Sequence, residues 1–463
     1  MKDTKKAQLI EGSIAKTLFN LTIPMMLGML GMSAFNLTDT YFVGQLGTRE
    51  LAAMSFTFPV VMIISSLAHG LGIGVSAVVS RAIGEGDQKK VQRLTTDSLV
   101  LSLLLVVSFV ATGLLTITPL FRFLGATPEI LPLIERYMRV WYLGMIAVVI
   151  PMVGNSATRA TGDTKTPGMI MLVAVFVNII LDPLFIFGIG PFPRLEIVGA
   201  ALATVFGRTI TLCVALWVLI RRDKMITFER PSLNTLLQSW KHMLYIGLPT
   251  AGTNMLLPIS AGIITKLIAT YGPAAVAGFG VATRVEMFAL LPVMALSSVL
   301  GPFIGQNWGA KKYERVWAGS SYSHRFSIGW GLGMFLLLAF SGKFIASLFN
   351  PDPVVISTAA TYLWIVPLGY GAQGGLRLST IALTVLHKPL RSALITLVQA
   401  FILHIPLAYL GSQIFDLKGV FSAAVMSYLI AALIAYWWLK NSLATEQGIA
   451  LSQQLDTRVI ETL

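Results

Sequence analysis

Twelve apolar segments, each long enough to cross a lipid bilayer, follow one another along this chain. A membrane-spanning helix needs about 20 predominantly apolar residues, and only 12% of the 463 residues are charged. Because lipid cannot form hydrogen bonds with backbone N–H and C=O groups, these groups must bond to each other within the segment, as they do in a helix. We therefore expect an all-α integral membrane protein with twelve transmembrane helices. The expected spans are 17–45, 51–80, 94–121, 131–158, 167–190, 197–220, 243–268, 274–304, 317–349, 355–386, 391–414 and 419–439.

Cysteine and histidine are too sparse for redox or metal chemistry. Cys213 is the single cysteine, which excludes an internal disulfide, and the five histidines show no metal-ligand spacing. The chain contains no GxxxxGK[ST], HExxH or GxSxG motif, so neither an ATP-driven motor nor a hydrolase is indicated. We expect a protein that is not an enzyme and carries no cofactor.

Lysine and arginine concentrate in every second loop. With a cytoplasmic N-terminus, the inward segments carry 21 of them, against seven in the outward loops and the outer start of the fourth helix. The positive-inside rule then places both termini in the cytoplasm, in a cell (inner) membrane. The same distribution explains the net charge of +13 without a nucleic-acid partner.

The longest polar break, residues 221–241, falls near the midpoint, and the two halves repeat each other across it. Pro24 matches Pro249 at a separation of 225 residues, and Gly47 matches Gly272 at the same separation. Two six-helix repeats with an even number of spans enter the membrane in the same direction, an arrangement in which transporters bind substrate in a central cavity. The expected domains are an N-terminal lobe (1–222), a cytoplasmic linker (223–242), a C-terminal lobe (243–440) and a cytoplasmic tail (441–463).

Two carboxylates interrupt the apolar segments of the first half. Asp39 lies deep in the first span and Asp182 in the fifth. A charge at the bilayer centre costs about 2.5–3.5 kcal/mol on insertion scales, so such a group faces protein or water. The repeat places Ile264 and Ile405 at the matching positions, so the fold does not require an acid there. We infer that both carboxylates serve function.

Each acid has an asparagine beside it on the expected helix. Asn36 precedes Asp39 by three residues, and Asn178 precedes Asp182 by four, so each pair shares a face. Two carboxylates in a dehydrated site favour a shared proton or a bound cation. Because an amide can donate to a carboxylate and offer an oxygen to a cation, the set suits either H+ or Na+.

Other residues are weaker candidates. Pro24 is expected to kink the first helix before Asp39, because proline removes a helical hydrogen bond. Asn155, Arg284 and Glu286 are candidate substrate-cavity residues. Arg284 and Glu286 are two apart and point away from each other on a helix, which argues against a mutual salt bridge.

Three segments and the repeated six-helix organisation carry a family resemblance: NLTDTYFVGQLGTRELAA, VNIILDPLFIFG and GAALAT. Through these features the chain resembles the multidrug and toxic compound extrusion family, in its DinF-like branch. The resemblance implies a proton or cation site, or a metal site if Na+ is the ion, in the N-terminal half. Its residues are Asp39, Asn178, Asp182 and Thr204, with Asn36 beside them.

The resemblance also implies that protonation of Asp39 bends the first helix at Pro24 and expels the drug.

One difference from the NorM-like branch supports the assignment to the DinF-like branch. In the NorM-like branch a glutamate on the seventh helix and an aspartate on the tenth form a second cation site. Here the seventh-helix position falls near Leu257 and Pro258, and the tenth helix contains no acid, so a site of that kind is not expected.

The leading hypothesis is a monomeric secondary antiporter that exports bulky, amphipathic, often cationic drugs by alternating access, driven by H+ or Na+. The alternative is a flippase of lipids or lipid-linked precursors, which would need several cations in its cavity; only Arg284 and Arg377 are candidates. A passive channel fits poorly, because channels usually repeat their selectivity residues around a pore.

Overall fold

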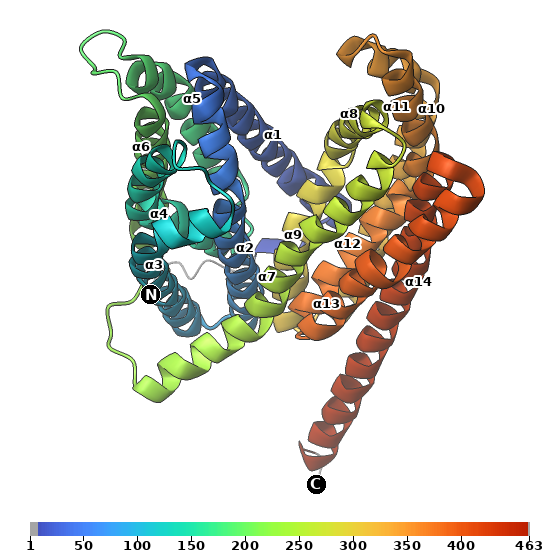
Figure 1. Cartoon of the computed structure of the whole chain (residues 1–463). Coiled ribbons are helices and arrows are strands. Elements are labelled where there is room, and N and C mark those ends of the chain that lie inside the picture. Colours follow the sequence, from blue (N-terminus) through green and yellow to red (C-terminus); the bar gives the residue numbers. More distant parts are fainter. Residues whose placement is uncertain (1–7, 462–463) are drawn as a thin grey trace. The chain divides into compact units, whose positions relative to one another are not determined.

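The computed structural model describes residues 8–461, with side chains described as far as residue 445. Every regular element in this range is helical (Figure 1). The short helices are η1 (Gln8–Ile10), η2 (Val218–Arg222), η3 (Val366–Gly369) and η4 (Val398–His404). The α-helices are α1 (Ile14–Leu46), α2 (Thr48–Glu85), α3 (Gln88–Phe123), α4 (Leu131–Ala160), α5 (Lys165–Phe187), α6 (Glu196–Trp217), α7 (Leu233–Ala269), α8 (Pro273–Ala289), α9 (Leu291–Gly309), α10 (Tyr313–Phe349), α11 (Pro353–Ile365), α12 (Tyr370–Val385), α13 (Pro389–Leu397) and α14 (Ile405–Glu461).

Helix breaks explain how these elements form membrane spans. Among the described residues, ten helical stretches are long and apolar enough to cross a membrane, and α8 with α9, bent by 46° at Leu290, forms an eleventh. The expected eighth span, 274–304, is therefore broken in two. The tenth span is also built from pieces, because η3 separates α11 from α12.

A kink within α14 supplies the twelfth span. Phe415 (φ −133°) and Asp416 (φ 51°) leave the helical conformation, and the chain turns back there (Figure 1). The backbones of Gly411 and Gly419 touch on the two sides of the turn, where a Cβ on Gly419 would lie 1.9 Å from the Gly411 oxygen. The twelve-span prediction is confirmed. The second arm continues as helix to Glu461, through most of the segment predicted as a tail.

Two compact units make up the chain. The first contains Asn20–Gly252, and the second combines Leu9–Phe19 with Thr253 and the residues after it. The start of α1 therefore belongs to the second unit. Its anchor is buried: the Leu9 amide donates to Gln306 Oε1 at 3.1 Å, and Asn307 Nδ2 donates to the Leu9 carbonyl at 3.0 Å. We expect these two hydrogen bonds to fix the residues just before α1 to the second unit.

The internal repeat is visible in the backbone. Gly47 (φ 146°) and Gly272 (φ 103°) cap the N-termini of α2 and α8 in similar extended, positive-φ conformations. Gly86 (φ 77°) and Lys311 (φ 58°) occupy matching positions after α2 and α9. Because positive φ is uncommon outside glycine, its recurrence at a separation of 225 residues supports a duplicated six-helix fold.

The segment after η2 is held against α3 within the first unit. The Thr227 amide donates to Thr96 Oγ1 at 3.0 Å, and Arg93 donates to the Glu229 carbonyl at 2.8 Å. Trp240, at the start of α7, donates its indole N–H to the Asp97 carbonyl at 3.0 Å. The first part of the predicted 223–242 linker is thus packed onto α3.

The α4–α5 loop is tied to the end of η2 by Asp163. Its Oδ2 accepts from Arg222 at 2.6 Å and from Thr166 Oγ1 at 2.6 Å. Burial alone would raise the pKa of Asp163, but hydrogen bonds from Thr166 and Arg222 and the arginine charge together lower it. The carboxylate therefore stabilises the folded state at neutral pH.

Replacing Asp163 with asparagine is expected to lower the free energy of unfolding at pH 7 by about 1 kcal/mol, because the pair is partly exposed. Because the pKa of Asp163 is lower in the folded state, the ionised carboxylate stabilises the fold at pH values above the unfolded-state pKa of about 3.9. This stabilisation is lost as the pH falls through the folded-state pKa. Thermal unfolding in detergent between pH 3 and 7 tests this. The asparagine variant should lose less stability on acidification than the wild type, and parallel curves would contradict the assignment.

Candidate functional site

Asp39 of α1 and Asp182 of α5 lie buried in the first unit. Asp39 is 6% exposed, whereas Asn178 and Asp182 are fully buried. Asn178 Nδ2 donates to Asp182 Oδ1 at 3.0 Å, one helical turn along α5. The predicted pairing of this asparagine and aspartate on one helix face is therefore present.

Close packing of α1 on α5 brings the two acids together. A Cβ on Gly28 would lie 3.1 Å from the Gly168 Cα, so the two helices approach through glycines. One turn beyond each acid, Val43 and Ile186 belong to the same buried apolar cluster. Along the two helices, the acids thus lie between the close approach of Gly28 to Gly168 and the apolar cluster that contains Val43 and Ile186.

The two carboxylates and a tyrosine interact electrostatically. The Asp39 charge acts on Asp182, and both charges act on Tyr137 of α4. Tyr137 is 5% exposed, so it forms part of the interior wall near the site. Sequence reasoning missed this residue, because a tyrosine in an apolar span gives no signal of which side chain it will approach.

Several oxygens at the site lack partners among the described residues. They are Asp39 Oδ1, Asn178 Oδ1 and Asp182 Oδ2, all buried. Buried polar atoms are normally satisfied, and each exception calls for a ligand, water or proton. Carboxylate and amide oxygens are suitable ligands for a hard cation, and two neighbouring carboxylates can also share a proton.

Two other predicted site residues are not joined to this group. Asn36 is exposed, and Thr204 of α6 is partly exposed. Within the described side chains, no hydrogen bond connects either one to Asp39 or Asp182. Three residues correspond to 300° of helical rotation, which turns Asn36 about 60° away from Asp39 and toward the exposed surface of α1.

Pro24 lies in α1 where that helix meets α5. A Cβ on Gly168 would lie 2.6 Å from the Pro24 carbonyl oxygen, so glycine is needed for this approach. The predicted hinge residue is therefore packed against the helix that carries Asp182. Pro183, directly after Asp182, lies inside α5 as well.

The three candidate cavity residues differ in their surroundings. Asn155 is 7% exposed and its Oδ1 has no partner among the described residues. Arg284 is exposed, and Glu286 is partly buried and bonded to Tyr362 and Gln373. No ion pair within the described part of the chain joins Arg284 to Glu286, as the spacing predicted.

Arg208 of α6 is a further charged residue in the first unit. Its guanidinium lies 5.4 Å from the centre of the Phe35 ring on α1, one turn before Asp39. Its Nε is buried and has no partner among the described residues. Sequence analysis did not select Arg208, although an arginine within an apolar span is itself a functional signal.

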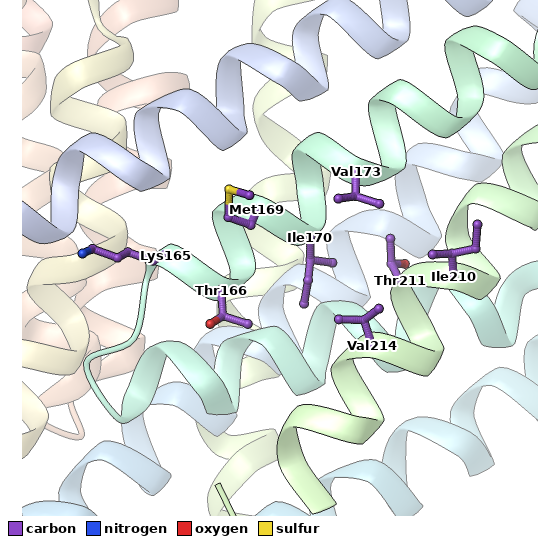
Figure 2. A pocket seen from close by; sticks show the side chains of 8 residues that line it. All are labelled: Lys165, Thr166, Met169, Ile170, Val173, Ile210, Thr211 and Val214. Atoms are coloured by element: carbon purple, nitrogen blue, oxygen red, sulfur yellow. The ribbon is translucent and has the colours of Figure 1, made fainter. Parts of the chain in front are cut away.

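A pocket between α5 and α6 is separate from the acids. Figure 2 shows its lining side chains, which are mostly apolar and enclose about 230 Å3. Neither Asp39 nor Asp182 lines it, so it is not the predicted ion site. The lining residues are Lys165, Thr166, Met169, Ile170, Val173, Ile210, Thr211 and Val214.

Comparison with known proteins decides the family. A family model described as MatE matches residues 24–184 and 249–410, which together make up most of the chain. The chain belongs to the MATE family. It is a multi-pass membrane efflux transporter and not an enzyme, as the sequence predicted. The DinF-like branch remains a prediction.

Individual MATE relatives cover nearly the whole chain. An FAD transporter of Shewanella oneidensis is 40% identical over 437 residues, which is 94% of this chain and 96% of that protein. The multidrug export protein MepA of Staphylococcus haemolyticus is 25% identical, covering 97% and 99%. The crystal structure of the Vibrio cholerae MATE transporter VcmN in the bent form matches with a TM-score of 0.89 and 31% identity, covering 96% and 99%.

Proposed function

We propose that Asp39 and Asp182 bind the ion that drives export. The observation that supports this most directly is the unpartnered, buried set of oxygens on Asp39, Asn178 and Asp182. Uptake of a positive ion offsets the repulsion between the two carboxylates and their loss of hydration. The transporter acts as a monomer and needs no cofactor beyond this ion.

The ion is H+ or Na+, and the same atoms serve both. A proton shared by Asp39 and Asp182 leaves one negative charge, while Na+ needs several oxygen ligands at once. Asn178 already donates to Asp182, which leaves its own carbonyl oxygen available for a cation. Imposing a proton gradient alone, and then a sodium gradient alone, separates the two ions.

The first candidate substrates are amphipathic organic cations. Several relatives are multidrug export proteins, including MepA. A buried carboxylate pair attracts a cation, and apolar helix surfaces accommodate the body of such a molecule. Export of a lipophilic cationic dye would support this substrate class.

FAD is the second candidate substrate. The relative with 40% identity is an FAD transporter, whereas MepA is 25% identical. Arg208 also offers an unpartnered guanidinium N–H beside the Phe35 ring. Arginine recognises phosphate, and an aromatic ring can stack on a flavin or adenine, so the pair fits an anionic dinucleotide.

Proteoliposomes that contain the purified transporter separate these substrates. Efflux of FAD and of ethidium is measured under the same ion gradient, in wild type and in Arg208→Gln. FAD efflux by the wild type that Arg208→Gln selectively abolishes would support the dinucleotide. Ethidium efflux without FAD efflux in the wild type would support drug export, and no efflux of either would favour the lipid flippase.

Replacing Pro24 with alanine is expected to slow transport while substrate binding is retained. Alanine restores a backbone hydrogen bond worth about 1 kcal/mol, so bending α1 becomes harder by roughly that amount. The expected rate falls about five- to tenfold. Efflux rate and equilibrium binding of the same dye are compared, and an unchanged rate would remove Pro24 from the mechanism.

A further inference from the structure

The pocket between α5 and α6 has an apolar body and a charged end (Figure 2). Ile170 and Thr211 line its inner side and are 6% and 3% exposed. The Thr211 hydroxyl donates to the Arg208 carbonyl of its own helix at 2.7 Å, so its hydrogen is not available to a ligand. Lys165 lies at one end of the lining, and its side chain points away from the apolar residues. The body of the pocket therefore suits a hydrocarbon chain.

Two unpaired cations lie at the charged end. Lys165 is the first residue of α5, Arg221 belongs to η2, and both are exposed. Arg222 Nη1 donates to Thr166 Oγ1 at 2.6 Å, which places the end of η2 beside the start of α5. Within the described side chains, neither Lys165 nor Arg221 forms an ion pair. Both remain available to an anion.

The acids at this end are bonded to Arg222. Asp163 Oδ2 accepts from Arg222 at 2.6 Å, and Asp223 Oδ1 accepts from it at 2.8 Å. These two acids and the cations Lys165, Arg221 and Arg222 together carry a net charge of +1. A single phosphodiester, which carries one negative charge, would balance it.

The pocket opens on the side of α5 that faces away from α1. Gly168 approaches α1 closely, because a Cβ there would lie 2.6 Å from the Pro24 carbonyl oxygen. Thr166, two residues earlier, lies about 160° around α5 from Gly168. Met169 and Val173, which border the pocket, are 61% and 41% exposed. A large exposed apolar surface on a membrane span is suited to contact with lipid chains.

The size of the pocket favours a single acyl chain over a drug. Drug-sized ligands occupy about 300–1,000 Å3, whereas this pocket encloses about 230 Å3. An apolar lining alone does not select one lipid, because lipid tails are as apolar as the side chains around them. Any selectivity must therefore come from the charged end.

We propose that this pocket binds one anionic phospholipid from the leaflet that borders the α4–α5 loop. Its acyl chain lies along Met169, Ile170 and Val214, and its phosphate lies at Lys165 and Arg221. Lysine and arginine both bind phosphate oxygens, and basic pockets between transmembrane helices bind anionic head groups. The lipid is a bound component of the transporter and not its cargo. The inference does not depend on the proposed coupling site.

Fluorescence quenching of Trp217 by brominated lipid tests this inference. Trp217 is 59% exposed and follows Val214 by three residues, so it lies within one helical turn of the pocket. The purified full-length transporter is placed in dioleoyl phosphatidylcholine bilayers that contain dibrominated phosphatidylglycerol or dibrominated phosphatidylcholine. The emission of Trp217→Phe in the same lipids is subtracted. We expect a binding preference of at least about fivefold for phosphatidylglycerol, and equal quenching by the two lipids would overturn the inference.

Charge variants separate this site from the general attraction of a basic protein to anionic lipid. Lys165→Gln combined with Arg221→Gln should abolish the preference for phosphatidylglycerol, because the unpaired positive charges are gone. Lys440→Gln, at an exposed position at the other end of the chain, is the control and should leave the preference unchanged. A double variant that retains the wild-type preference would overturn the inference.

A pocket-filling variant tests the acyl-chain part of the proposal. Val214→Phe fills the apolar body while the charged end stays intact, so an acyl chain no longer fits and the preference should fall toward one. Val100→Phe on α3 is the matched control, because Val100 and Val214 are both 38% exposed. Its preference should equal that of the wild type. If Val214→Phe also kept the full preference, head-group attraction at the surface would explain the data and the pocket would be excluded.

Discussion

Replacing Asp39 with asparagine is expected to abolish ion-driven export while the protein still folds. Asparagine has nearly the same volume but cannot take up a proton or balance a cation. Loss of a charge-assisted contact worth about 3 kcal/mol corresponds to a rate at least about a hundredfold lower. Dye or FAD efflux from proteoliposomes, normalised to the amount of folded protein, measures this effect.

Asp416→Asn is the matched control for this substitution. Asp416 is exposed, lies at the α14 kink and has a positive φ that asparagine tolerates. Its export rate should stay close to wild type. Export by Asp39→Asn at the Asp416→Asn rate would refute the role of Asp39. Combining Asp39→Asn with Asp182→Asn should add little, because the two residues act as one site.

Replacing Gly168 with alanine is expected to disturb the contact between α5 and the hinge of α1. The added Cβ would lie 2.6 Å from the Pro24 carbonyl oxygen and 3.2 Å from its carbon, so backbone must move. Overpacking of this kind lowers the free energy of unfolding by about 1–3 kcal/mol. Thermal unfolding in detergent and the efflux rate should both fall.

Gly44→Ala on α1 separates steric conflict from a general glycine effect. A Cβ at Gly44 meets no atom within 4 Å, so alanine fits there. Alanine within a helix is favoured over glycine by about 0.5–1 kcal/mol, so stability should be unchanged or slightly higher. Similar losses in both variants would contradict the close-contact explanation for Gly168.

The number of spans was predictable from the sequence, because an apolar segment of about 20 residues matches the length that a helix needs to cross a bilayer. Helix breaks were harder to predict. Pro292, the second residue of α9, lies directly after the bend at Leu290, and Gly411 and Gly419 flank the turn at Phe415 and Asp416. Proline is common in membrane helices, so these residues alone did not identify the breaks. The span limits near these breaks therefore differ most from expectation.

The buried acids were predictable because a charge in an apolar segment is conspicuous. Their partners were only partly predictable. Asn178 follows from helical spacing to Asp182, but Tyr137 comes from another helix and Asn36 turns outward. Glu286 was selected as a charged residue, whereas its partners Tyr362 and Gln373 depend on helix packing that spacing does not reveal.

Simultaneous measurement of substrate export and ion movement tests the coupling claim most directly. Proteoliposomes carry wild-type or Asp39→Asn protein, a transported dye or FAD, and a reporter of lumenal pH or sodium. We predict that an imposed proton or sodium gradient drives export in the wild type with counter-movement of that ion, and that Asp39→Asn loses both. Export that proceeds equally in the two proteins under the same gradient would contradict an ion site at Asp39 and Asp182.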